Sequence, residues 1–362
     1  MNPESLTVAV VGATGVVGRT MIQVLNEREF PVGEFRLLAS GRSAGRTVSI
    51  DGRTLEIGEA VPEAFDGVDI ALFSAGGDVS RELAPAAVAH GATVIDNSSA
   101  WRMDPTIPLV VSQVNPDDLE GHPGIVANPN CSTMQLAPVL MALRDAVGLE
   151  RVVVDTYQSV SGTGADAIAE LEAQIRAHVH GEPKTASVYP HPIAFNALPE
   201  IDDFLPNGYT KEEWKVVSEN RKILDLPDLR ISCTAVRVPV FVSHSEAVHV
   251  ETRGPITPDR ARELFAAVPG VIVRDDPATH DYPLATEAAG RDEIFVGRVR
   301  HDASVGDDRG LAFWVVSDNL RKGAATNAVE LAEALRARGW VRPAVQRGAR
   351  PYAAPGAPGA TA

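Results

Sequence analysis

Residues 6–18 read LTVAVVGATGVVG, a short apolar run followed at once by three regularly spaced glycines. The run Leu6 to Val11 is typical of a buried parallel strand, and apolar residues then recur at helical spacing from Val17 to Leu25. In this order, Gly12 allows a tight turn, Gly15 lets the backbone approach a pyrophosphate, and Gly18 lets the helix pack closely on the strand. The N–H groups of the helix start would face the phosphates. The stretch therefore predicts a dinucleotide-binding unit, with an ordinary strand-to-helix turn as the alternative.

The second expected strand, Phe35 to Ser40, ends without the acidic residue that usually binds the ribose hydroxyls of NAD. Arg42 and Ser43 follow Ser40 instead, and no carboxylate occurs before Asp51. A guanidinium group and two hydroxyls suit the additional phosphate of NADP. The sequence therefore predicts a preference for NADP, unless Arg42 is simply an exposed loop arginine.

The parallel sheet continues in three further apolar runs, Ile70 to Phe73, Thr93 to Ile95 and Ile125 to Ala127. The first of these ends in small residues, Ser74 to Gly77, which suit a strand end close to a ligand. We also expect a hairpin turn at Asp51-Gly52 and a packing helix at Ala84 to Ala89.

Beyond residue 130 the pattern becomes that of an α+β domain with a mostly antiparallel sheet. Strand-like segments lie at Arg151 to Val160, Ile231 to Val250, Glu293 to Arg300 and Leu311 to Val316, and helix-like segments lie at residues 136–143, 168–175 and 258–267. A last helix, Ala324 to Arg336, could return to the first domain. The Ala/Pro/Gly-rich end of the chain, Pro351 to Ala362, is expected to be disordered.

Composition narrows the class of protein. The chain has 362 residues, 44% of them hydrophobic, which suffices for two domain cores. Its formal net charge of -15 argues against a general affinity for nucleic acid or for anionic membrane surfaces. The N-terminus lacks the pattern of a signal peptide, and no apolar run approaches the ~18 residues that span a bilayer. Two cysteines are too few for a disulfide scaffold or a multi-cysteine metal site, so we predict a cytoplasmic protein without a metal.

Cys131 is the leading candidate for a nucleophile. It lies in Asn128-Pro129-Asn130-Cys131-Ser132-Thr133, where loop-forming residues give way to a helix-like run that begins near Met134. The positive end of a helix dipole stabilises a thiolate, and nearby backbone N–H groups could stabilise an oxyanion on an attacked carbonyl. A lone cysteine is more commonly a small buried hydrophobic residue, but the polar neighbours of Cys131 argue against an apolar pocket.

Arg237 and His244 lie in one apolar segment and are candidate partners of such a nucleophile. An arginine there needs a partner such as a substrate carboxylate, and a histidine that titrates near neutral pH could act as an acid or base. Because their separation of seven is odd, a regular strand would place the two on opposite faces unless Pro239 bends it. The alternative is a surface arginine and a structural histidine.

Two further polar groups have simple alternatives. Glu212 and Lys215, three residues apart, would share one face of a helix as a ligand site or as a solvated ion pair. Arg102 follows a strand end, where it could face a bound anion or be an exposed loop arginine.

Taken together, five motifs resemble the bacterial aspartate-β-semialdehyde dehydrogenases from Val8 to about Lys322. They are residues 12–18, 128–133, 158–162, 212–215 and 237–245, and they occur in the family's order. The resemblance implies an α/β fold with an NADP-binding Rossmann domain at residues 1–130, completed by a C-terminal helix at 320–340. It also implies a central α+β catalytic and dimerisation domain at residues 131–319. A homodimer is expected, with assembly to a tetramer left open, and residues 341–362 fall outside the resemblance as a disordered tail.

Carried over residue by residue, the resemblance makes Cys131 the nucleophile, His244 the acid/base and Gln158 a residue that orients the acyl group. Arg102, Asn130 and Lys215 would bind phosphate, Arg237 the substrate α-carboxylate, and Glu212 the substrate ammonium. The expected cofactor-binding residues are Gly12, Thr14, Gly15, Val16, Val17, Ser40, Arg42, Ser43, Ser74, Gly76, Ser161, Gly162 and Asn319, the last near the nicotinamide.

The reaction that the resemblance implies is the NADPH-dependent conversion of L-aspartyl 4-phosphate to L-aspartate 4-semialdehyde, with release of phosphate. It belongs to lysine, threonine and methionine biosynthesis, with diaminopimelate on the lysine branch. Attack by Cys131 would give a thioester, which hydride reduces while His244 transfers the proton. One alternative is an N-acetylglutamyl phosphate reductase, whose substrate nitrogen carries no charge for Glu212. The other is a regulatory protein that binds NADP and in which Cys131 is incidental.

Overall fold

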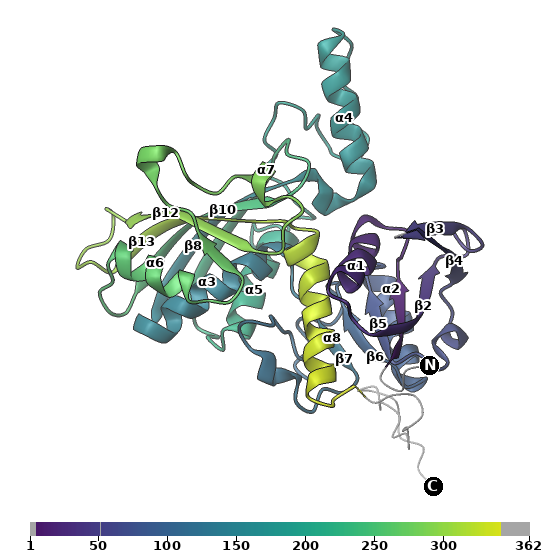
Figure 1. The fold of residues 1–362 in the computed structure, drawn as a ribbon. Helices are drawn as coiled ribbons and strands as arrows, with labels where there is room; N and C mark the ends of the chain where they lie inside the picture. The colour runs from purple at the N-terminus through teal and green to yellow at the C-terminus, as the bar shows by residue number, and fades with distance from the viewer. Residues whose placement is uncertain (1–4, 51, 342–362) are drawn as a thin grey trace. The chain divides into compact units, whose positions relative to one another are not determined.

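The computed structural model describes residues 5–50 and 52–341, which divide into two compact units (Figure 1). The first unit holds the chain up to residue 112, residues 116–128 and the chain from residue 328. The second holds residues 113–115 and 129–327. Asp51 of the expected hairpin turn and residues 342–362 of the expected tail lie outside the described residues.

A seven-stranded sheet forms the centre of the first unit, in the order β3-β4-β2-β1-β5-β6-β7. Its strands are β1 (Leu6–Val11), β2 (Val32–Ala39), β3 (Thr47–Ile50), β4 (Arg53–Glu59), β5 (Ile70–Phe73), β6 (Thr93–Asp96) and β7 (Ile125–Ala127). All neighbouring strands pair in parallel except β3 and β4, which pair antiparallel. The predicted strands at Leu6, Ile70 and Ile125 are confirmed, because each is a buried apolar run bounded by turn residues.

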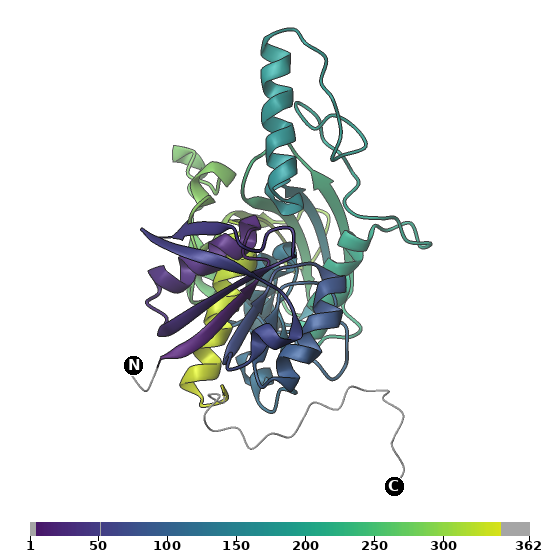
Figure 2. The same ribbon diagram turned by 90° about the vertical axis from the view of Figure 1, so that its right-hand side faces the viewer.

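β1 and β5 lie side by side, and the helix that follows each of them leads to the next strand in opposite directions across the sheet. The connection β1-α1-β2 runs one way through α1 (Val16–Glu27), and β5-α2-β6 runs the other way through α2 (Gly77–Ala89). Right-handed crossovers of opposite direction place their helices on opposite faces, as Figure 2 shows. α8 (Asn327–Ala337) joins α1, because Arg28 at the end of α1 forms a two-pronged ion pair with Glu333. A ligand crevice is expected where the strand order reverses, between the ends of β1 and β5.

The glycine-rich turn after β1 is crowded in the way the sequence predicts. Gly12 has φ +88°, and a Cβ there would lie 2.4 Å from the backbone oxygen of Ser74 at the end of β5. A Cβ at Gly18 would lie 2.3 Å from the backbone oxygen of Gly12. The glycines therefore let α1 pack directly against the end of β1.

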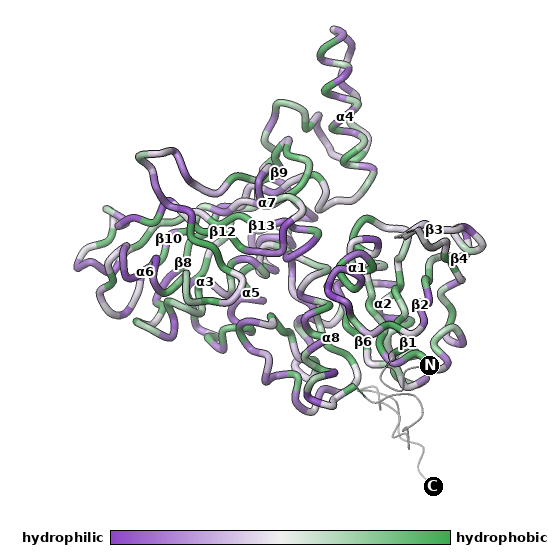
Figure 3. The backbone as a smooth tube through the Cα atoms, viewed as in Figure 1, coloured by the Kyte–Doolittle hydropathy of each residue, from purple (hydrophilic) through white to green (hydrophobic). Residues whose placement is uncertain are grey.

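The second unit is built on a mixed sheet of six strands in the order β11-β12-β13-β10-β8-β9. They are β8 (Leu149–Gln158), β9 (Arg230–Arg237), β10 (His244–Thr252), β11 (Val271–Val273), β12 (Ile294–His301) and β13 (Gly310–Ser317). The three central pairings are antiparallel, and the outermost pair at each edge is parallel. Hydrophobic and hydrophilic residues are mixed along its central strands (Figure 3), and the buried hydrophobic ones form the core of the unit.

Three helices cover one face of this sheet and close its hydrophobic core. They are α3 (Cys131–Val147), α5 (Lys211–Ile223) and α6 (Pro258–Ala266). α4 (Ala165–Val179) instead extends away from the sheet in both views (Figures 1 and 2) and packs in a separate small cluster around Leu171. α7 (Ala285–Ala288) is a single short turn.

Several boundaries differ from those that the sequence suggests. α2 begins at Gly77 and α3 at Cys131, each earlier than expected. The C-terminal helix is preceded by a π-helical turn, Arg321–Thr326. No helix in the part of the chain that the structure describes is long and apolar enough to cross a membrane.

Candidate active site

Cys131 is the first residue of α3, and its neighbour Asn130 caps the helix. The Asn130 side-chain oxygen accepts hydrogen bonds from the backbone N–H groups of Ser132 at 2.9 Å and Thr133 at 3.4 Å. This cap satisfies donors that a helix start leaves without intrahelical partners, which is why α3 begins before its apolar run. Cys131 is partly exposed, whereas Cys233 is buried in β9. The predicted setting of a cysteine at a helix N-terminus is confirmed.

The π-helical turn lies directly against this cysteine. A Cβ at Gly323 would lie 2.9 Å from the Cβ of Cys131, closer than real Cβ atoms approach. Glycine is therefore required at position 323 if the backbone is to pass so near. The sequence carries no signal for this contact, because the two residues are far apart along the chain.

Three predicted site residues, Gln158, Arg237 and His244, lie at one level of the six-stranded sheet. Gln158 pairs with Arg237 across β8 and β9, and His244 pairs with Ser317 across β10 and β13. The pairing of Ser245 with Tyr157 brings His244 to the level of Gln158, and their side-chain nitrogens lie 3.4 Å apart. The expectation of a single segment with an odd spacing was wrong: Arg237 ends one strand and His244 begins another, so parity does not separate them.

His244 is fully buried and held as a neutral imidazole. Its Nδ1 accepts a hydrogen bond from the backbone N–H of Ser159 at 3.0 Å. Burial, reinforced by the charge of Arg237, lowers the pKa of His244 to about 3. Because Nδ1 acts as the acceptor, the proton of the neutral ring resides on Nε2. His244 thus presents a hydrogen-bond donor at Nε2.

Arg237 is a buried cation with unused binding capacity. Its Nη1 donates to the backbone oxygen of Ser159 at 2.7 Å, and its guanidinium lies 6.0 Å from the ring centroid of Tyr189. Among the described residues, its buried Nε has no hydrogen-bond partner. A Cβ at the exposed Gly162 would lie 3.0 Å from Arg237 Nη1 and 3.2 Å from His244 Nε2. Gly162, expected at the cofactor, therefore keeps space open beside both of these groups.

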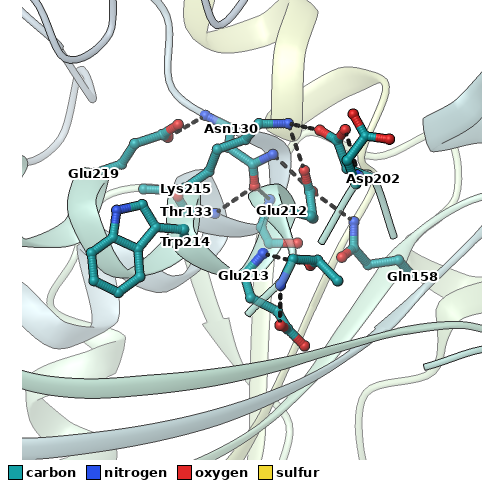
Figure 4. A network of polar contacts seen from close by, with 12 residues as sticks. Asn130, Thr133, Gln158, Asp202, Glu212, Glu213, Trp214, Lys215 and Glu219 are labelled. Atoms are coloured by element: carbon teal, nitrogen blue, oxygen red, sulfur yellow. Dashed lines mark hydrogen bonds and ion pairs between the residues drawn. The ribbon is translucent and has the colours of Figure 1, made fainter. Parts of the chain in front are cut away.

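Glu212 is the centre of a buried polar network between α3, α5 and β8 (Figure 4). One carboxylate oxygen accepts from Asn130 Nδ2 at 2.9 Å and Gln158 Nε2 at 3.1 Å, and the other accepts from Lys215 Nζ at 3.1 Å. Burial by itself would raise the pKa of Glu212, but Lys215, the two amides and Arg237 together lower it to about 2. Glu212 is therefore an ionised carboxylate that connects three other predicted site residues.

Two acidic residues complete this network without having been predicted. Asp202 binds Lys215 Nζ at 2.8 Å, and Glu219 accepts the backbone N–H of Asn130 at 2.7 Å (Figure 4). Glu219 lies seven residues after Glu212, on the same face of α5, so helical periodicity could have identified it. Asp202 lies in a loop and offers no comparable signal.

Asn319 holds the loops around His244 together. Its Oδ1 accepts from Ser159 Oγ and Ser161 Oγ, each at 3.1 Å, and from the backbone N–H of Ser243 at 2.9 Å. Its Nδ2 donates to Ser161 Oγ at 3.0 Å. Asn319 and Ser161, which were expected at the cofactor, thus also fix the backbone that surrounds the histidine.

The remaining predicted residues belong to the first unit. Thr14, Gly15, Val16 and Val17 form the turn and the start of α1, Ser74 and Gly76 follow β5, and Ser40, Arg42 and Ser43 follow β2. Arg102 is buried and donates to the backbone oxygens of Asn97 and Asn128, so it is not the exposed loop arginine of the alternative interpretation.

A carboxylate that the sequence analysis missed lies beside the predicted ribose site. A Cβ at Gly41 would lie 2.6 Å from Glu59 Oε1 at the end of β4. Glu59 reaches this place through the parallel pairing of β4 with β2, in which it lies opposite Ala39. Reading only the end of β2 could not reveal it.

Comparisons with known proteins agree with this arrangement. The semialdehyde dehydrogenase NAD binding domain family matches residues 7–122, and the semialdehyde dehydrogenase dimerisation domain family matches residues 140–322. The aspartate-semialdehyde dehydrogenase of Aquifex aeolicus is 52% identical, over 92% of this chain and 99% of that protein. That of Bacillus subtilis is 49% identical, over 92% of this chain and 98% of its own length.

Solved structures give the same result. The crystal structure of aspartate semialdehyde dehydrogenase II from Vibrio cholerae, complexed with ASA, superimposes with a TM-score of 0.88 at 47% identity. The match covers 91% of this chain and 98% of that one. The chain therefore belongs to the aspartate-semialdehyde dehydrogenase family of oxidoreductases.

Proposed function

We propose that this dehydrogenase forms a thioester on Cys131 and, with NADPH, reduces L-aspartyl 4-phosphate to L-aspartate 4-semialdehyde. The observation that carries the proposal is that Arg237, Gln158 and His244 lie side by side on three neighbouring strands. Glu212 links Gln158 to Asn130 at the start of α3, next to Cys131. This arrangement offers a nucleophile, a neutral hydrogen-bond donor and a buried cation within one unit. The thiol chemistry fits a reducing compartment such as the cytoplasm, and the product fits lysine, threonine and methionine biosynthesis.

The thiolate of Cys131 attacks the acyl carbon, and the tetrahedral intermediate expels phosphate to leave a thioester. The amide of Gln158 is held by Glu212, so it can orient the acyl group during attack. Lys215 remains cationic, since contacts with Glu212 and Asp202 raise its pKa despite burial. A cation there favours departure of the phosphate, and Asn130 and Arg102 are proposed to share that role.

The tautomer of His244 suits the second half of the reaction. Reduction of the thioester places negative charge on the carbonyl oxygen, and a proton on Nε2 can stabilise that charge and be transferred to it. Collapse of the resulting thiohemiacetal returns the proton and releases Cys131. The hydrogen bond from Ser159 to Nδ1 fixes this direction of proton transfer.

Arg237 is proposed to bind the substrate α-carboxylate. A buried guanidinium with an unpartnered Nε, in the part of the chain that the structure describes, can donate two hydrogen bonds to a carboxylate in a bidentate pair. Glycine at position 162 keeps a side chain from crowding Arg237 and His244, the two groups between which the substrate is proposed to bind. Glu212 is proposed to attract the substrate ammonium by its charge, although its oxygens already accept bonds from the chain itself.

The first unit fits a bound NADP. The start of α1 has neither a side-chain cap nor an acidic residue in its first turn, so its N–H groups remain suited to a pyrophosphate. Arg42 and Ser40 are exposed at the end of β2, where they would reach the additional phosphate. Bound NADPH would supply the hydride. Ser74 and Gly76 follow β5 at the expected crevice, where the strand order reverses.

A homodimer is also proposed, through the other face of the six-stranded sheet. Side chains alternate along strands, so Tyr157 and Trp314 point away from Gln158 and Ser317. Their rings lie 5.4 Å apart, and Tyr157 is 39% exposed. An exposed aromatic surface on the unit that matches a dimerisation domain suits an isologous contact.

The reverse reaction tests the proposed substrate. Purified protein with NADP would receive aspartate semialdehyde or N-acetylglutamate semialdehyde, each with and without phosphate, while NADPH absorbance is followed. We expect turnover with aspartate semialdehyde and phosphate together, and none with the acetylated compound or without phosphate. Turnover without phosphate would contradict the acyl phosphate, and activity on the acetylated compound alone would contradict the proposed substrate.

Replacing Arg42 tests the cofactor preference. Arg42→Ala should weaken NADP binding by about 1.5–3 kcal/mol, the contribution of one charge-assisted contact, and leave NAD binding nearly unchanged. Titration calorimetry with both cofactors measures this, with Arg46→Ala as a control arginine exposed in the same loop. Equal losses for NADP and NAD would show that Arg42 does not recognise the phosphate.

Cysteine labelling tests the nucleophile. Iodoacetamide at neutral pH should modify Cys131 well before Cys233, because Cys233 is 3% exposed and burial raises the pKa of its thiol. Cys131→Ala should abolish turnover and retain NADP binding, whereas Cys233→Ala should remain active. Faster labelling of Cys233, or turnover by Cys131→Ala, would remove the basis of the thioester mechanism.

Replacing His244 tests the proton donor. His244→Asn should lower turnover by about 10²–10⁴-fold, while His301→Asn, at an exposed position, should not. Because the pKa of His244 is near 3, the ring stays neutral as the pH falls from 8 to 5. The pH profile should therefore show no loss with the usual histidine pKa. A near-normal rate for His244→Asn would mean that another group carries the proton.

A further inference from the structure

A second carboxyl group, Glu246, is buried one level below the row that contains His244. It follows His244 by two residues on β10 and therefore faces the same side of the sheet. Its strand neighbours at that level are Thr156 on β8 and Val315 on β13. Its side chain is fully buried, and the proposed reaction assigns it no role.

The carboxyl of Glu246 lies near an amide that also lacks a partner. Neither oxygen of Glu246 makes a hydrogen bond with any described residue, and the same holds for Nε2 of Gln135. The Gln135 amide is nevertheless near enough to lower the pKa of Glu246. An amide N–H and the carbonyl oxygen of a carboxylic acid are complementary, so a small adjustment joins them.

Gln135 links Glu246 to the proposed catalytic groups. It follows Cys131 by four residues on α3, so the two share one face of the helix, one turn apart. Its Oε1 accepts a hydrogen bond from Ser317 Oγ at 2.7 Å. Ser317 in turn pairs with His244 across β13 and β10. Gln135 is thus a polar contact between the helix of Cys131 and the strands around His244.

The surroundings of Glu246 favour its uncharged form. Burial raises its pKa to about 8, and no cationic contribution offsets this among the residues that the structure describes. β9 contributes the thiol of Cys233, whose own pKa is raised by burial and by Glu246. From α5, Glu212 and Glu213 add negative charge near that thiol, as does Asp155 of β8. The facing residue of α3 is Gln135, and that of β13 is Val315.

We propose that Glu246 acts as an uncharged carboxylic acid that positions Cys131 against His244 through the amide of Gln135. This role rests on the proposed functions of Cys131 and His244. The neutral acid accepts from Gln135 and leaves the Gln135 oxygen bonded to Ser317. A charged carboxylate in the same place would attract every nearby donor, including Ser317 Oγ, and would disturb the first turn of α3.

The free energy of unfolding should also depend on the protonation of Glu246. The pKa of Glu246 is raised from an ordinary 4.5 to about 8, so the folded state retains a proton that the unfolded chain has lost. The free energy of unfolding of the wild type should therefore fall relative to that of Glu246→Gln as the pH rises from 4.5 to 8. Above pH 8 the difference should stay constant.

The test compares the wild type, Glu246→Gln, Glu246→Leu and Gln135→Met with the core control Val248→Ala. Val248 is fully buried on the same face of β10, one level farther from His244. Above pH 8 the wild-type kcat should fall by up to about tenfold per pH unit, as for loss of one essential proton. Glu246→Gln should keep the neutral-pH kcat and lack this loss, whereas Glu246→Leu and Gln135→Met should lower kcat with KM nearly unchanged. Val248→Ala should be less stable, with the wild-type pH profile.

Three outcomes would overturn the proposal. One is an alkaline loss shared equally by the wild type and Glu246→Gln. Another is failure of Glu246→Gln to fold, because glutamine reproduces the shape of the uncharged acid. The unfolding measurement requires no catalysis, so its result is independent of the thioester mechanism, which Cys131→Ala tests separately. The third outcome is an unchanged kcat in Gln135→Met, which would exclude the link through Gln135.

Discussion

Compensation of the buried charge of Glu212 is the constraint on which the second unit's site depends. Lys215, Asn130 and Gln158 supply the bonds that let an ionised carboxylate remain out of water, and they come from three different elements. Removing a partner from such a buried pair typically costs about 3–5 kcal/mol. The same carboxylate that anchors the helix start of Cys131 also aims the amide of Gln158. Binding geometry and folding stability are therefore joined in one group.

Glu212 and Glu246 show how one sheet face can hold two carboxyl groups in opposite states. The first has a cation and two amides and keeps a pKa of about 2, whereas the second meets one amide in an apolar layer and has a pKa of about 8. Environment alone makes this difference, since the two side chains are identical. Because side chains alternate along each strand, the two faces of the sheet also differ in character. One face of the sheet carries the polar row of Gln158 and His244, and the other carries the exposed Tyr157 beside the half-buried Trp314.

Local patterns allowed much of the fold to be predicted. β1, β5 and β7 are short apolar runs between turn residues, and the glycines after β1 are required by contacts at Ser74 and Gly12. From local patterns, the site was predictable only where its residues are neighbours in the sequence, as at Asn130-Cys131. The proximity of Arg237 and His244 depends on β8 lying between their strands, which no local pattern specifies. Glu59, Gly323 and Gln135 escaped prediction for the same reason: each meets its partner through strand pairing or helix packing.

The bonds of Asn319 have a consequence for how the site opens. One side-chain amide joins the segment of Ser159 and Ser161, the turn at Ser243, and its own loop. Local unfolding of any one segment removes a donor from an acceptor that the others share, so partial opening leaves the remaining bonds weaker. The three segments should consequently fluctuate as one cooperative unit, and their backbone amide hydrogens should exchange with solvent at similar rates.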